Sequence, residues 1–190
     1  GDYVIDYNDK IDMGNPNPDL VGGFINQFSY KNFSLSTLVS FVFGRSLWNG
    51  YLSDKLQDAG SSTLYNTWGT NSAIAGDFKP SDFWMKDGDQ TKYPTLFRNT
   101  VDNWHIANST FVENASFVRL KNIQLSYTFP QAMIKKLKLK MLRVYGVVDN
   151  VAVKAWSSVP DPEAVEANGY STGNGYPIPK KWTIGLDVTF

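Results

Sequence analysis

The chain has 190 residues, enough for one ordinary domain or part of a larger protein, and its 18 basic and 18 acidic residues give zero net charge. This balance excludes the basic surface that nucleic-acid binding requires, so no nucleic-acid partner is expected. Charged residues make up 19% of the sequence and aromatic residues 15%, whereas an average soluble domain has roughly 25% charged residues. The absence of cysteine excludes disulfide and thiol chemistry.

The mean hydropathy is −0.30, and no stretch approaches the roughly 20 consecutive apolar residues that a membrane-spanning helix needs. Low charge, many aromatic residues and moderate hydropathy suit a transmembrane β-barrel, in which the lumen face and the loops dilute the lipid-facing residues. No targeting segment begins the chain, so we expect the start of an exported protein to lie upstream.

Residues 1–19 form a polar, turn-rich approach to the first strand. Asp6, Asn8, Asp9 and Asp12 are spaced like oxygen ligands of a hard cation. The complete calcium-loop pattern also needs a central glycine and a later bidentate glutamate, and both are absent. Asp6, Asn8 and Asp12 are therefore an incomplete candidate for calcium, and a solvated loop is the alternative.

Two strands are predicted over residues 20–30 and 33–43, joined by a minimal turn at Lys31-Asn32. Asparagine tolerates the positive φ that such turns demand. In the second strand Phe33, Leu35, Thr37, Val39, Phe41 and Phe43 alternate with a mostly serine set that also contains Leu38 and Val42, which indicates one drier and one wetter face. Its length matches the roughly 9–11 residues of a tilted strand that crosses a bilayer.

Residues 44–114 are predicted to be a long extracellular loop with little regular structure. Loops longer than about 12–15 residues are uncommon in compact domains and are usually functional. Trp48, Trp68, Trp84 and Trp104 offer flat apolar faces for stacking on a sugar or peptide ligand or on a partner. The alternative is that these aromatic residues form a small core of the loop itself.

A third strand is predicted over residues 115–129, where Ile123, Leu125 and Tyr127 alternate with polar residues. Arg119 and Lys121 do not fit on a lipid-facing surface, so we expect a bulge or the membrane boundary near Asn122. The basic stretch 131–140 that follows is either a helical turn at the membrane surface or a plain solvated turn.

The last two strands are predicted over residues 141–153 and 181–190, separated by a proline-rich loop. In the final strand the apolar residues fall on one face, which we expect to meet lipid, with the last aromatic residue at the lipid–water boundary. This predicted assembly strand carries Trp182, Ile184, Leu186, Val188 and Phe190.

Long and short connections alternate along the chain, which is the pattern of an outer-membrane barrel with short periplasmic turns and long external loops. Five strands are too few to close a barrel, and an open sheet with a lipid face would aggregate. We therefore predict an all-β fragment of a larger antiparallel transmembrane β-barrel, with hydrocarbon against Phe33, Val39, Phe41, Ile184 and Leu186. The alternatives are a soluble or surface carbohydrate-binding β-sandwich, and an adhesin or purely structural barrel.

The sequence carries no recognisable catalytic pattern. His105 is the only histidine, so a histidine-rich metal site is excluded. The acidic residues are scattered, and neither GxxxxGK[ST] nor GxGxxG occurs. We therefore expect no enzyme activity, no cofactor and no firm metal site.

Several segments together resemble the SusC/RagA family of TonB-dependent outer-membrane transporters, over essentially the whole chain. They are GNPNPDLVGGF (14–24), FVENASFVRLKNIQLSYTFP (111–130), LRVYGVVDN (142–150), DPEA (161–164) and YPIPKKWTIGLDVTF (176–190). The resemblance implies the C-terminal strands of a large, plugged barrel of the 22-stranded type in the outer membrane of a Gram-negative bacterium. The family's calcium-like loop is shortened here, and its Arg-Trp-Thr-Pro stretch is replaced by Phe83-Trp84-Met85-Lys86, so ligand contacts do not carry over.

The same resemblance implies import of glycans, glycan fragments or peptides that are too large for porins. A SusD-like surface lipoprotein would cover the barrel and help to bind the ligand. Energy would come from TonB, ExbB and ExbD through a contact segment that, like the plug, lies upstream of this chain.

Overall fold

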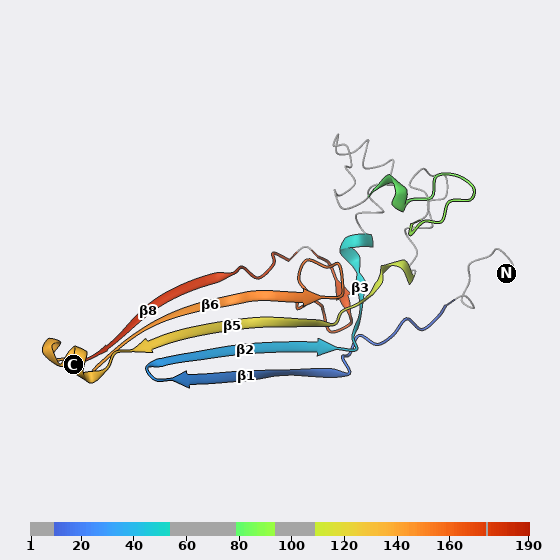
Figure 1. Ribbon diagram of the computed structural model, residues 1–190. Helices are drawn as coiled ribbons and strands as arrows, with labels where there is room; N and C mark the ends of the chain where they lie inside the picture. Colours follow the sequence, from blue (N-terminus) through green and yellow to red (C-terminus); the bar gives the residue numbers. More distant parts are fainter. Residues whose placement is uncertain (1–9, 54–78, 94–108, 174) are drawn as a thin grey trace.

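The main element of the fold is a five-stranded antiparallel sheet in the order β1-β2-β5-β6-β8 (Figure 1). The computed structural model describes residues 10–53, 79–93, 109–173 and 175–190. Each strand of this sheet pairs with the next of the five along the chain, so the sheet is a meander. The strands are β1 (Leu20–Tyr30), β2 (Phe33–Phe43), β5 (Phe117–Thr128), β6 (Met141–Ala155) and β8 (Lys181–Thr189).

The two ends of the sheet differ in the connections that they carry (Figure 1). At one end, here called the short-turn end, β1 joins β2 through Lys31 and Asn32, and β5 joins β6 through the helical turns α4 (Gln131–Ile134) and η4 (Lys135–Leu137). The left-handed residue of the first turn is Lys31, with φ 54°, and not Asn32 as the sequence suggested. The opposite, long-loop end carries the β2–β5 and β6–β8 connections.

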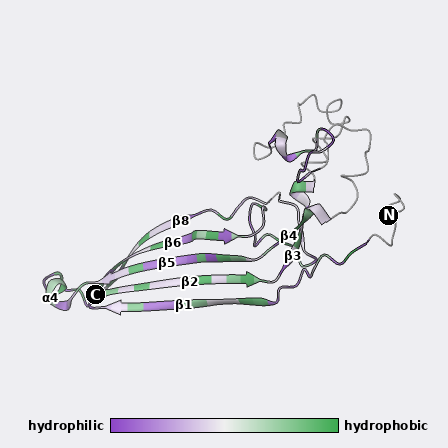
Figure 2. Cartoon of the chain, turned by 45° about the vertical axis from the view of Figure 1, so that its right-hand side comes forward, coloured by the Kyte–Doolittle hydropathy of each residue, from purple (hydrophilic) through white to green (hydrophobic). Residues whose placement is uncertain are grey.

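The pairing register sorts the side chains of the sheet into two faces, and hydrophilic and hydrophobic colours alternate along its strands (Figure 2). Phe24 lies opposite Val39, Leu35 opposite Leu125, and Gly146 opposite Ile184, so the apolar residues of all five strands share one face. In the part of the chain that the structure describes, no second layer covers this apolar face. Ile184 is 87% exposed, Leu186 62% and Phe33 50%, while Val39 and Phe41 are half-buried between neighbouring strands. These residues are therefore not packed into a closed interior.

A bulge lies where the sequence predicted a bulge or the membrane boundary. The register between β2 and β5 shifts at Leu38/Val39, and the register between β5 and β6 shifts between Leu120 and Asn122. Lys121 is the extra residue, so Arg119 pairs with Ser40 on the polar face while Leu120 remains on the apolar face. The bulge therefore removes the arginine from the apolar surface.

A second, three-stranded sheet in the order β4-β3-β7 lies at the long-loop end. It consists of β3 (Ser46–Asn49), β4 (Val112–Asn114) and β7 (Tyr170–Ser171). The short helical turns η2 (Pro80–Asp82) and η3 (Ser109–Phe111) belong to the connection between β3 and β4. Among the described residues, two clusters of buried apolar side chains lie at this end, one around Phe111 and the other around Leu47. Among the described residues, no helix is long and apolar enough to cross a membrane.

Candidate functional site

The polar face of the main sheet is paired across strands by charged and amide side chains. Arg143 of β6 binds Asp187 of β8 with 2.5 Å between Nη2 and Oδ2, and Asn122 donates to Asp149 at 2.7 Å. Near the short-turn end, serine, glutamine and threonine side chains of β1, β2 and β5 line a shallow hollow of about 290 Å³ together with Arg143. This face presents hydroxyl, amide and charged groups, as the wall of a water-filled lumen does.

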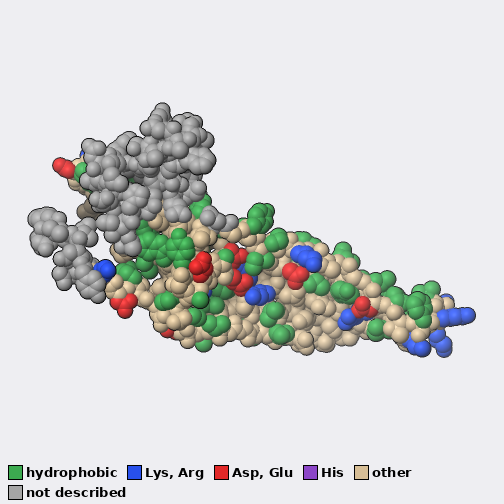
Figure 3. Space-filling model, turned by 180° about the vertical axis from the view of Figure 1, so that it is seen from behind, with side chains coloured by type: hydrophobic (Ala, Val, Ile, Leu, Met, Phe, Trp, Pro, Cys, Tyr) green, Lys and Arg blue, Asp and Glu red, His purple; other side chains and the backbone are tan. Residues whose placement is uncertain are grey.

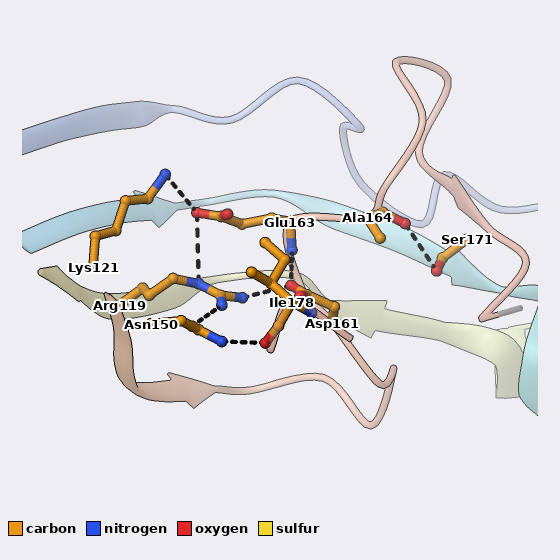
Figure 4. A network of polar contacts seen from close by, with 8 residues as sticks. All are labelled: Arg119, Lys121, Asn150, Asp161, Glu163, Ala164, Ser171 and Ile178. Carbon is orange, nitrogen blue, oxygen red and sulfur yellow. Dashed lines mark hydrogen bonds and ion pairs between the residues drawn. The ribbon is translucent and has the colours of Figure 1, made fainter. Parts of the chain in front are cut away.

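Arg119 is the centre of a buried ionic cluster at the end of β5 that leads to the loops (Figure 4). Its Nη2 lies 2.5 Å from Oδ1 of Asp161, and the two side chains are only 3% and 6% exposed. Its Nη1 donates to Asn150 Oδ1 at 2.5 Å. Glu163 lies 3.6 Å from Arg119 Nε and accepts a closer contact of 3.1 Å from Lys121. Two cations and two anions therefore balance within the cluster.

This cluster fixes both ends of the β6–β8 loop, residues 156–180, against the sheet. Asp161 Oδ1 also accepts the Glu163 amide at 3.0 Å, and its Oδ2 accepts the Ile178 amide at 3.3 Å. The Asn150 side chain donates to the Ile178 carbonyl. Asn150 has φ 52°, a left-handed conformation that asparagine tolerates better than most residues. The DPEA segment therefore serves as the attachment point of the loop.

Arg45, two residues after β2, joins three loops in a second anchor. Its Nε donates to the Pro16 carbonyl at 2.8 Å, and its Nη2 donates to the Glu166 carbonyl at 2.8 Å. Burial lowers the pKa of the Arg45 guanidinium from its ordinary value. The approach segment before β1 and the β6–β8 loop are thus tied to the root of the β2–β5 connection.

Glu113 on β4 forms a third anchor between β3 and the β6–β8 loop. It accepts the amide and the hydroxyl of Ser158 at 2.6 Å each, and the side chain of Asn49 at 3.0 Å. Asn49 is fully buried and accepts the amide of Leu52 at 2.9 Å. Side chains from separate loops are therefore hydrogen-bonded into one platform at the long-loop end.

The structure describes two of the four predicted tryptophans. Trp48 packs edge-to-face on Phe111 with 5.3 Å between ring centroids, against a core that contains Leu52, Phe83 and Tyr93. It also lines a cavity of about 140 Å³ beside Asn168. Trp84 is 37% exposed. Trp68 and Trp104 lie outside the described residues.

The alternative of a core formed by the loop itself therefore applies to Trp48, because its ring packs on the buried Phe111 and against the cluster to which Phe111 belongs. Of Trp48 and Trp84, Trp48 is half-buried and Trp84 is exposed. The two remaining tryptophans stay predictions.

The calcium candidate falls mostly outside the described part of the chain, which begins at residue 10. Asp12 is described, and its Oδ1 accepts the Gly14 amide at 3.0 Å, which forms a local turn. Among the described residues, no group of three or more histidine, cysteine or acidic side chains is placed to hold a metal ion.

The joint role of Arg119, Asn150 and Asp161 could not be predicted from the sequence. Arg119 is a charge within an apolar alternation, and Asp161 lies in the DPEA segment that resembles the transporter family. An arginine within an apolar strand pattern was the one feature that indicated this cluster. Such a charge needs an acidic partner when it is buried. Asp161 lies 42 positions after Arg119 in the sequence, and such a distance does not reveal which acidic residue is the partner.

The predicted assembly strand extends over Lys181–Thr189, with Phe190 just beyond its end. Trp182 and Phe190 are 73% and 80% exposed. Within the described part of the chain, β8 pairs only with β6 and β1 only with β2. Both sheet edges are thus free to accept neighbouring strands of a barrel.

The comparisons with known proteins agree with this architecture. No family model matches the chain. It is 32% identical over 196 residues to TonB-dependent receptor P39 of Formosa agariphila and covers 18% of that protein. It is 28% identical to receptor P26 of the same organism and 26% identical to TonB-dependent receptor SusC of Bacteroides thetaiotaomicron, covering 19% and 17% of them. Each comparison matches the whole of this chain. The chain spans less than a fifth of the length of each relative.

Solved structures of the RagAB peptide importer in its open-open and closed-closed states match 92% of this chain. The TM-score is 0.67 at 23% identity, and the match covers 17% of each solved chain. This likeness shows that the sheet is a piece of the same large barrel fold. Along its whole length the chain is similar to a part of the TonB-dependent receptors of the SusC/RagA type, and its sheet has the fold of that part.

Proposed function

We propose that the protein to which this chain belongs imports a nutrient across the outer membrane of a Gram-negative bacterium, with energy supplied through TonB. The observation that carries the proposal is the single-layered sheet, apolar on one face and polar on the other. Such a sheet is suited to separate lipid from a watery lumen. A β-sandwich would need a second sheet packed on the apolar face, and none is present in the described ranges.

The ends of the sheet support an orientation in the membrane. Barrels of this class keep short turns on the periplasmic side and long loops outside. We therefore place the turn at Lys31 and the α4–η4 connection in the periplasm, and the three anchored loops on the cell surface. The C-terminal position of these strands in the barrel is part of the same proposal.

The substrate class we propose is a glycan fragment or a peptide. The matched solved structure is that of a peptide importer, and the aromatic residues of the long loop suit either ligand. A SusD-like lipoprotein would cover the loop platform, and TonB, ExbB and ExbD would act through a segment upstream. The proposed activity is transport, with no bond made or broken.

The test is uptake by cells that produce the full-length protein with its neighbouring lipoprotein. Two probes are used, a fluorescent pool of oligosaccharides and a fluorescent pool of oligopeptides. We expect one pool to accumulate in the periplasm, and we expect accumulation to stop in cells that lack TonB. Accumulation of both pools without TonB would indicate a passive pore, and accumulation of neither would reject both substrate classes.

Trp84 provides the sharper test of ligand contact. We expect Trp84→Ala to weaken binding of the transported pool about 10-fold, because truncating an aromatic residue that anchors a ligand typically costs more than about 1 kcal/mol. Fluorescence titration of the purified full-length protein measures the affinity. Trp156→Ala is the control, since Trp156 is 51% exposed but packs on Phe43 at 5.9 Å, at the lipid-facing rim. Unchanged affinity in Trp84→Ala removes Trp84 from the ligand site.

A further inference from the structure

The two ends of the main sheet differ in charge, although the chain as a whole is neutral. Residues 28–33, 125–144 and 186–190 make up the short-turn end. They contain six basic side chains and one acidic side chain, Asp187, which is already paired with Arg143. The five other cations are Lys31, Lys135, Lys136, Lys138 and Lys140, all exposed. Figure 3 shows basic side chains gathered at this tip of the molecule.

Four of these lysines lie in the short helical connection between β5 and β6. Ile134 is 2% exposed and anchors the turn. Lys138 closes it in a left-handed conformation, with φ 56°, and donates its amide to the Lys135 carbonyl at 3.1 Å. Met133 and Leu137 are 60% and 64% exposed on the same turn. Exposed apolar side chains interleaved with lysines are typical of segments that lie in a membrane interface.

An aromatic belt places this turn relative to the bilayer. The rings of Phe33 and Tyr127 are in tilted contact on the apolar face, with 4.7 Å between their centroids, and Tyr30 pairs with Phe33 beside the first turn. Tyrosine and other aromatic residues in such a belt mark the lipid–water boundary of a barrel. The Lys31 ammonium lies 5.3 Å from the Tyr30 ring. The lysines therefore come directly after the residues that end the lipid-facing surface, at the level of the headgroups.

We propose that Lys31 and the α4–η4 turn form a docking surface for the phosphate headgroups of anionic phospholipids in the periplasmic leaflet. The lysine ammonium groups would bind the phosphates, and Met133 and Leu137 would enter the acyl-chain boundary. The proposal rests on the proposed outer-membrane function, because it requires the sheet to stand in a bilayer with this end inward. The continuity of the cluster with the apolar face favours lipid over a soluble acidic protein.

The experiment measures lipid preference at this turn in the full-length protein reconstituted into vesicles. A bimane fluorophore on Ala132→Cys, in a background without other accessible cysteines, reports quenching by brominated phosphatidylglycerol or brominated phosphatidylcholine. The test variant carries Lys135→Gln, Lys136→Gln, Lys138→Gln and Lys140→Gln. The control removes the same charge at the long-loop end, with Lys79→Gln, Lys86→Gln, Lys180→Gln and Lys181→Gln.

We expect phosphatidylglycerol to be preferred locally over phosphatidylcholine, and this preference to fall about 10-fold or more in the test variant, since each lysine near an anionic surface contributes about fivefold. The control variant should keep the preference, and raising the salt should reduce it. Replacing chloride by inorganic phosphate at equal ionic strength should not change it further. Equal quenching by both lipids, an equal loss in the control, or full competition by inorganic phosphate would each overturn the proposal.

Uptake in the same variants keeps this proposal distinct from the transport proposal. Equal quenching by the two lipids in a protein that still imports in a TonB-dependent manner rejects only the lipid docking surface. A retained lipid preference in a protein that imports neither pool rejects only the transport proposal.

Discussion

Arg119→Ala is expected to release the β6–β8 loop from the barrel wall, with hydrogen exchange in residues 159–178 rising about 100-fold or more. The substitution leaves the carboxylate of Asp161 buried and without its cation, and breaking a buried pair in this way costs about 3–5 kcal/mol. Asp161 also accepts hydrogen bonds from the amides of Glu163 and Ile178. The loss of protection from hydrogen exchange should therefore appear at these two amides first. Hydrogen-exchange mass spectrometry of the full-length protein in detergent measures it.

Arg143→Ala is the matched control for this prediction. The Arg143–Asp187 pair has the same 2.5 Å contact as the Arg119–Asp161 pair, but its side chains are 40% and 35% exposed. A solvent-exposed pair is worth about 1 kcal/mol or less, so exchange in β8 should change less than about fivefold. If both variants loosen their segments equally, or neither does, burial of the Arg119 cluster is not what holds the loop.

Ile184→Arg is expected to destabilise the folded barrel by about 2–4 kcal/mol, because it places a guanidinium in the hydrocarbon region. Ile184 lies near the middle of β8 on the apolar face and is 87% exposed in the chain. In a water-facing sheet the same change would be nearly neutral, since an exposed isoleucine gains little from the sheet. The measurement is guanidinium unfolding of the full-length protein in lipid vesicles, together with its yield in the outer membrane.

Thr183→Arg tests the opposite face one residue away. Thr183 pairs with Val147 on the polar face, so an arginine there should point into the lumen and change the stability by less than about 1 kcal/mol. The test compares the stability changes caused by Ile184→Arg and by Thr183→Arg. Equal destabilisation, or a neutral Ile184→Arg, would mean that the apolar face does not meet lipid.

The strand pattern was readable from the sequence because side chains of a strand alternate between faces with period two. The faces of Phe33–Phe43 and Lys181–Thr189 followed from that alternation alone. Arg119 and Lys121 do not fit on an apolar face, and this correctly predicted a bulge near Asn122. Details of the turns were less accessible: asparagine is the usual left-handed residue, yet Lys31 takes that role here.

The contacts of the loop residues could not be predicted from the sequence, for a different reason. Trp48 could be read as a ligand platform or as core, and only its contact with Phe111 favours core. The partners of Arg45 and Arg119 lie on loops that are remote along the chain, and sequence spacing does not specify such pairs.

By itself the sequence determined the amphipathic strands, their order, the short and long connections and the resemblance to a transporter family, because these properties are local or follow from short segments. Only the tertiary structure decided which charge meets which. The bulge turned Arg119 to the polar face, and the β6–β8 loop folded back to bring Asp161 within 2.5 Å of it. The physical reason is that a buried ion pair depends on register and on loop closure together, and both are set by contacts between distant residues.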